Sequence, residues 1–165
     1  MYILEAEVQK KYLKDLTFLK KDEKNWIMYY HNPKTNEMWK TYYPLSCKNG
    51  RGPKVMRTEP LPDTLEEHLD ICLRSELPDD AIGAAYDYAF RFEDWSKIVK
   101  ILENRYRNYP RKQLKRFIHN LGIEQPEEQL RKAGSSYETI IPDKEELDDL
   151  ARKTKKIRYK SLWPF

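Results

Sequence analysis

The spacing of apolar residues changes abruptly at a proline-containing segment, Glu59-Pro60-Leu61-Pro62. Before it, aromatic and β-branched residues form two short runs on either side of Asn32-Pro33-Lys34-Thr35-Asn36, a sequence typical of a turn. After it, apolar residues recur every three or four positions, as in amphipathic helices. The sequence therefore predicts an α+β fold, in which an N-terminal aromatic β-hairpin or small sheet packs on a C-terminal array of antiparallel helices.

The length of 165 residues fits one domain with its own core. We expect a mixed part over residues 1–60, a helical part over 63–155 and a basic-aromatic tail over 156–165. In the mixed part, helical spacing predicts a helix over 4–19, although its last residues, LTFL, also fit a strand.

The hairpin is predicted over residues 26–43. Alternation along its first strand places Trp26, Met28 and Tyr30 on one face and Ile27 and Tyr29 on the other. One face can pack on helices, and the other is then either buried as well or displays aromatic side chains to a partner.

Several helices are predicted after the proline segment. Asp63 and Asp79 are expected to cap two of them, and the last is expected over residues 143–155. Pro110 is expected to interrupt the helical pattern and Gly122 to end it. The clearest apolar stripe is formed by Trp95, Ile98, Val99, Leu102, Tyr106 and Tyr109.

Charge is distributed unevenly along the chain, although the net charge is only +4. Residues 61–94 hold 10 Asp and Glu against 2 Lys and Arg, and residues 95–120 hold 8 Lys and Arg against 1 Glu. The acidic block either pairs within the fold or partly stays exposed and docks a basic partner. The internal partners considered are Arg105, Arg107, Arg111, Lys112, Lys115 and Arg116.

No pattern of residues predicts catalysis, a metal or a cofactor. The three histidines, His31, His68 and His119, lie in different predicted elements and in no metal-binding spacing. Cys47 and Cys72 form no CxxC pair and are expected to be reduced thiols. We therefore expect a binding protein that is not an enzyme.

The segment KNGRGPK resembles a phosphate cradle because glycines let backbone N–H groups approach an anion. It lacks the GK[ST] ending of a nucleotide-binding loop, so an ordinary turn is the simpler interpretation. The alternative function is that of a nucleic-acid-binding accessory protein, and its candidate residues are Lys48, Arg51, Lys54, Arg111 and Lys112.

The runs WIMYYHNPKTNEMWKTYYP, RTEPLP and CLRSELPDDAIGAAYDYA resemble small immunity proteins encoded beside bacterial polymorphic or contact-dependent toxins. The resemblance covers roughly residues 24–105. It implies a protein without catalytic activity that neutralises one cognate toxin by covering its active site or an adjacent surface.

The expected partner is therefore a protein toxin, with nucleic acid as the second choice and no membrane. The charged N-terminus, MYILEAEVQKKYLKDL, is unlike a signal peptide and favours a cytoplasmic location, although leaderless export would leave no such mark. The residues predicted to bind the partner are Asp63, Glu66, Glu67, Asp70, Asp79, Asp80, Asp87, Trp26, Tyr30, Trp39 and Tyr43.

Overall fold

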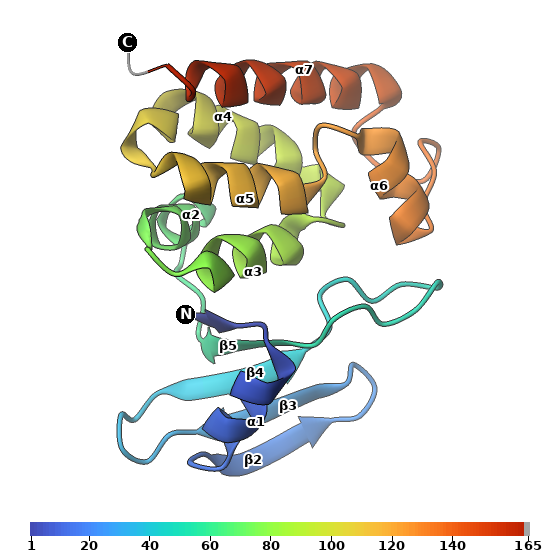
Figure 1. Ribbon diagram of the computed structural model, residues 1–165. Coiled ribbons are helices and arrows are strands. Elements are labelled where there is room, and N and C mark those ends of the chain that lie inside the picture. Colours follow the sequence, from blue (N-terminus) through green and yellow to red (C-terminus); the bar gives the residue numbers. More distant parts are fainter. Residues whose placement is uncertain (164–165) are drawn as a thin grey trace.

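The computed structural model describes residues 1–163 and consists of an antiparallel five-stranded sheet joined to an array of helices (Figure 1). The predicted α+β fold is confirmed. Pro164 and Phe165, the end of the predicted tail, lie outside the described residues.

The sheet is built around the predicted hairpin. In spatial order its strands are β1 (Tyr2–Ile3), β5 (Val55–Glu59), β4 (Met38–Tyr42), β3 (Ile27–His31) and β2 (Thr17–Asp22). The hairpin turn closes because the Asn32 side-chain oxygen accepts hydrogen bonds from the amides of Lys34 (2.9 Å) and Thr35 (3.3 Å). Asn36 completes the turn with a φ of 60°, in the left-handed region that asparagine tolerates.

The two faces of the sheet have different neighbours. A short helix, α1 (Ala6–Leu13), covers one face, where its Tyr12 ring lies 5.0 Å from the Trp39 ring. The opposite face carries Tyr2, Tyr42 and Arg57 and meets the helical part. The outer strands β2 and β3 extend beyond the helices, so exposed aromatic rings remain there, as on Phe18.

The helices stack away from the sheet in successive levels (Figure 1). Two helices lie nearest the sheet, two lie above them, one covers the top and one lies at the side. In residues 1–163 no helix is both long enough and apolar enough to cross a membrane. The helices nearest the sheet are α2 (Leu65–Arg74) and α3 (Pro78–Tyr88), and those above them are α4 (Trp95–Arg105) and α5 (Arg111–Leu121). Helix α7 (Lys144–Lys160) covers the top, and α6 (Pro126–Ala133) lies at the side.

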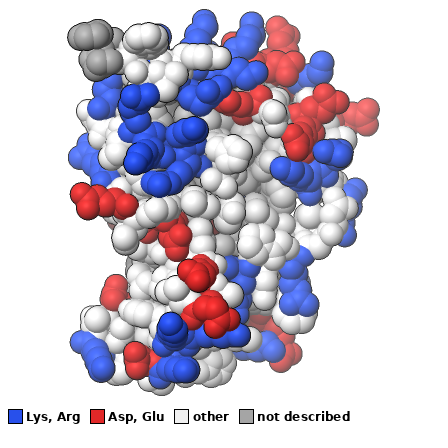
Figure 2. All heavy atoms as spheres, in the orientation of Figure 1, with Lys and Arg blue, Asp and Glu red and all other residues white. Residues whose placement is uncertain are grey.

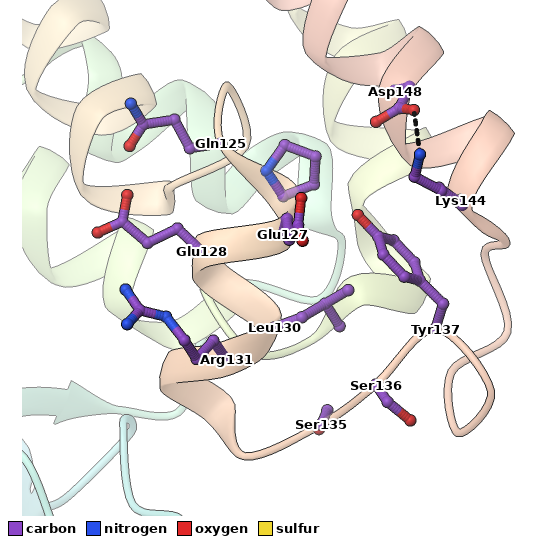
Figure 3. A pocket seen from close by; sticks show the side chains of 11 residues that line it. Gln125, Glu127, Glu128, Leu130, Arg131, Ser135, Ser136, Tyr137, Lys144 and Asp148 are labelled. Atoms are coloured by element: carbon purple, nitrogen blue, oxygen red, sulfur yellow. Dashed lines mark ion pairs between the residues drawn. The ribbon is translucent and has the colours of Figure 1, made fainter.

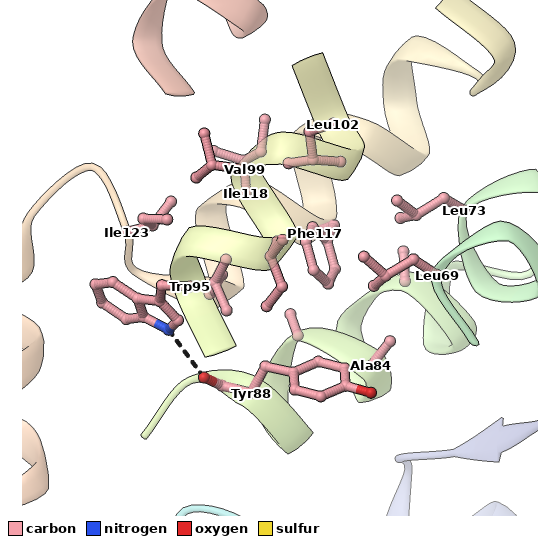
Figure 4. Close-up of a cluster of buried hydrophobic side chains, with 14 of the residues drawn as sticks. Leu69, Leu73, Ala84, Tyr88, Trp95, Val99, Leu102, Phe117, Ile118 and Ile123 are labelled. Carbon is pink, nitrogen blue, oxygen red and sulfur yellow. Dashed lines mark hydrogen bonds between the residues drawn. The ribbon is translucent and has the colours of Figure 1, made fainter. Parts of the chain in front are cut away.

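The core lies between these helices (Figure 4). The predicted stripe of α4 faces it, because Trp95, Ile98 and Leu102 are all fully buried. The Trp95 indole donates a 2.9 Å hydrogen bond to the Tyr88 carbonyl, so its one polar atom is satisfied inside the core. Pro110 and Gly122 act as predicted: α5 begins at Arg111, directly after Pro110, and Gly122, with a φ of 75°, caps its C-terminal end.

The N-terminal prediction was partly wrong. The helix ends at Leu13, and residues 17–22 form the edge strand β2, which agrees with the strand alternative for LTFL. Val8 and Leu19, two apolar residues at helical spacing within the predicted helix, are about half exposed. Strand β1 has only two residues, too short to leave an alternating pattern in the sequence.

Two helix caps and one helix end differ from prediction. Thr64, not Asp63, caps α2 by accepting a 3.1 Å hydrogen bond from the Glu67 amide. Helix α3 begins at Pro78, so Asp79 lies in its first turn, not at its cap. Helix α7 is capped by Asp143 and continues to Lys160, five residues into the predicted tail.

We predict that Gly83→Ala destabilises the protein by about 1–2 kcal/mol, because a Cβ at this position of α3 would overlap the Tyr2 ring. Helix propensity alone would give the opposite sign, a gain of about 1 kcal/mol. Urea unfolding would measure the change. Asn104→Ala, at an exposed position of α4, is the control and should be neutral or slightly stabilising; a stabilising Gly83→Ala would contradict the close packing of β1 on α3.

Candidate partner-binding surface

A buried carboxylate, Asp87 in α3, joins the sheet to the helices. It accepts hydrogen bonds from the hydroxyls of Tyr2 in β1 and Tyr42 in β4. The Nε of Arg57 in β5 lies 3.7 Å from the same carboxylate. Burial raises the pKa of Asp87, and these hydrogen bonds and the nearby positive charge oppose the rise. Asp87, a predicted partner-binding residue, is thus occupied within the fold.

His68 of α2 extends this network. Because the Tyr2 hydroxyl donates to Asp87, it accepts from His68 Nε2 at 2.8 Å. In a neutral imidazole, Nδ1 then accepts from the Tyr88 hydroxyl at 2.7 Å. Burial, followed by the charge of Arg57, lowers the pKa of His68 to about 4, in agreement with that protonation state.

Two further acidic residues hold the N-terminal strand. The Asp80 carboxylate lies 2.9 Å from the Met1 amino group and accepts from the Tyr2 amide at 2.9 Å. Its second oxygen accepts a 2.6 Å hydrogen bond from the Ser75 hydroxyl. Asp79 accepts from the Leu4 amide at 3.0 Å. Asp79, Asp80 and Asp87 therefore act together as a clamp on residues 1–4.

Glu66 and Asp70 of α2 are paired with α4. Both form ion pairs with Arg105, and the Tyr109 hydroxyl donates a 2.6 Å hydrogen bond to Asp70. Of the six basic residues considered as internal partners, Arg105 alone is paired with the acidic block among the described residues. Internal pairing thus accounts for only part of the block.

The other two acids predicted to bind the partner, Asp63 and Glu67, border an open groove between α2 and the end of the sheet. The groove has a volume of about 630 Å³, and Glu37 of the hairpin adds a third carboxylate to its border. No Lys or Arg lines it, and these three acids form no ion pair within residues 1–163. We call this surface the acidic groove; its other lining residues are Met1, Trp39, Thr58, Pro60, Leu61, Pro62 and Ile71.

The floor of the acidic groove is largely apolar. Ile71 is 52% exposed and lies outside the α2 stripe that faces the core. Sequence reasoning missed Ile71, Leu61 and Glu37 as site residues. An isoleucine out of phase with Leu65, Leu69, Cys72 and Leu73, next to a Pro-Leu-Pro segment, was the available signal. The contribution of Glu37 depends on strand pairing and could not be read from the sequence.

The four predicted aromatic residues do not form one patch. Trp39 lines the acidic groove, and its indole nitrogen is buried without a hydrogen-bond partner in the described structure. Tyr30 packs against Phe18 on the outer strands, with ring centroids 5.8 Å apart. Trp26 and Tyr43 both contact Arg51, whose guanidinium lies 3.9 Å from the Trp26 ring centroid.

The residues proposed for nucleic acid also separate into two regions. Lys48, Arg51 and Lys54 lie on the β4–β5 loop, which runs beneath α6, where the Cys47 thiol donates to the Lys132 carbonyl. Arg111 and Lys112 begin α5 at the other side of the helical array (Figure 1). The glycine loop leads into β5, and Gly50 and Gly52 have positive φ, as an ordinary turn requires.

A larger hollow of about 790 Å³ lies between α6 and the start of α7 (Figure 3). Its side chains include both signs of charge, and Lys144 pairs with Asp148 at 4.0 Å, one helical turn away. Ser136 is held in a local turn by Thr139 and is not aligned with a base. In the described part of the chain, no group of three or more His, Cys, Asp and Glu residues could hold a metal ion.

We predict that protonation of His68 weakens the fold at low pH. Because its pKa in the fold lies below the ordinary value of about 6.5, its contribution is complete above that pH and is lost as the pH falls towards 4. The loss amounts to about 3 kcal/mol at most. Urea unfolding of the wild type and of His68→Gln between pH 7 and pH 4 would measure it, since the variant lacks this dependence. His119→Gln, at an exposed position, should follow the wild type; parallel profiles for wild type and His68→Gln would contradict the assignment.

Comparisons with protein-family models, with curated proteins and with solved structures find no match to this chain.

Proposed function

We propose that this chain is a non-catalytic binding protein that neutralises a cognate bacterial toxin in the cytoplasm by direct contact through the acidic groove. The observation that carries the proposal is the combination of an apolar floor with three carboxylates that have no ion-pair partner in the described residues. Apolar contacts supply affinity, and the carboxylates favour a basic partner.

The acidic groove is suited to holding a partner in a fixed orientation. It is built from both halves of the protein, with Glu37 and Trp39 from the sheet, Asp63 from the linker, and Glu67 and Ile71 from α2. The clamp formed by Asp79, Asp80 and Asp87 fixes these halves relative to each other, so little ordering is needed on binding.

The choice of a toxin as the partner rests on the resemblance of residues 24–105 to immunity proteins. Such a protein neutralises its target by covering a surface, which requires complementary shape and charge but no reacting groups. A basic surface on the toxin, beside or over its active site, is the expected counterpart of the acidic groove.

We predict that Asp63→Lys with Glu67→Lys weakens toxin binding about 10-fold or more, because two attractive charges become repulsive. Ile71→Ala should also weaken it, through lost apolar contact, and both variants should stay folded because the three side chains are exposed. Co-purification and isothermal titration with the toxin-like product of the adjacent gene, together with growth protection on co-expression, would measure the effect.

The matched control is Asp15→Lys with Glu23→Lys, which changes the net charge equally at exposed positions outside the acidic groove. It should bind and protect like the wild type. Equal weakening by both pairs would point to general charge attraction and remove the acidic groove as the docking site, and the absence of any complex or protection would remove the toxin as the partner.

A further inference from the structure

A second hollow, of about 280 Å³, is lined by cations and aromatic rings where the ends of α4, α5 and α7 meet. It is separate from the acidic groove, with which it shares no lining residue. We call it the basic hollow; its lining residues are Tyr106, Arg107, Tyr109, Arg111, Lys160, Ser161 and Trp163. Figure 2 shows more basic side chains gathered over the neighbouring α5, which also carries Lys112, Lys115 and Arg116.

The positive charge of the basic hollow is not neutralised within the described residues. Arg107, Arg111 and Lys160 form no ion pair there, and no Asp or Glu lines the hollow. Asp70 accepts a hydrogen bond from the hydroxyl of Tyr109, one of the lining residues. Its ion pair is with Arg105, which does not line the hollow. Three unpaired cations on three structural elements are thus available to an anionic ligand.

The helix dipoles do not reverse this charge. The C-terminal ends of α4 and α7 each contribute about half a negative charge, and the N-terminal end of α5 contributes about half a positive charge. Their sum, about half a negative charge, is smaller than the three full positive charges of the side chains. Among the described residues, the field in the basic hollow is therefore set by Arg107, Arg111 and Lys160.

The aromatic rings provide a second kind of contact. Trp163 is 70% exposed, a large apolar face that the described residues leave open to a ligand. Tyr106 is half-buried and accepts a 3.2 Å hydrogen bond from Arg107 Nε, which holds the guanidinium beside the ring. Tyr109 is buried and serves as a wall. Cations beside an open indole are the combination that binds a phosphate and stacks on a base.

We propose that the basic hollow binds single-stranded nucleic acid, with Arg107, Arg111 and Lys160 contacting phosphates and Trp163 stacking on a base. A duplex keeps its bases stacked and presents none to the indole, so an unpaired strand is the matching ligand. This site extends the protein beyond toxin binding, because it lies apart from the acidic groove and uses the opposite charge.

Fluorescence anisotropy with a labelled oligothymidylate of about 10 nucleotides would test the proposal. The association constant should fall about 100-fold for each tenfold rise in salt, because three phosphate contacts give a logarithmic slope of about −2. Trp163→Ala should weaken binding about 10-fold while leaving most of the salt slope unchanged. Arg107→Glu with Lys160→Glu should weaken it further and flatten the slope.

The matched control is Lys11→Glu with Lys34→Glu, an equal charge change at exposed positions on the sheet half of the protein. It should retain binding. Three results would overturn the proposal. They are an equal loss of binding in this control, equally tight binding of a duplex of the same length, and equal displacement by polyglutamate. The last result would assign the basic hollow to acidic proteins. Unchanged binding by Trp163→Ala would also overturn it, because stacking is what separates this ligand from other polyanions.

Discussion

The interaction on which the structure most depends is the hydrogen bonding of Asp87 to Tyr2 and Tyr42 across the contact between the sheet and α3. Burying a carboxylate is unfavourable unless hydrogen bonds and an opposite charge compensate for lost water, and two hydroxyls with Arg57 supply both. Because those groups come from three different strands, the network specifies one orientation of sheet on helices. The apolar core between the helices supplies stability without such directionality.

This network explains how the acidic block is divided. Asp79, Asp80 and Asp87 hold the N-terminal strand, and Glu66 and Asp70 hold α4 through Arg105. Of the acids predicted to bind the partner, Asp63 and Glu67 are not used in this way, and they lie with Glu37 from the hairpin at the acidic groove. A strong local charge in the sequence therefore serves mainly to assemble the fold, and two of the acids left over, Asp63 and Glu67, border the surface proposed to bind the toxin.

The acidic groove and the basic hollow are connected through the contact between α2 and α4. Asp70 and Arg105 connect α2, which borders the acidic groove, to α4, which ends at the basic hollow. Opposite surface charges at separate places allow the two proposed ligands to bind without competing for the same residues. They also give the chain a net charge near balance despite strong local charge.

The sequence by itself determined the α+β class, the hairpin with its Asn32 turn, the buried stripe of α4, and the helix boundaries at Pro110 and Gly122, because these depend on local spacing and backbone preferences. Only the tertiary structure decided that β1 and β2 complete the sheet, that Asp80 and Asp87 are turned inward, and that Glu37 joins Asp63 at the acidic groove. Whether a carboxylate is a clamp, an ion-pair partner or a free charge depends on which distant donors reach it. The role of each carboxylate therefore depends on packing between elements far apart in the chain, and it cannot be read from a local sequence pattern.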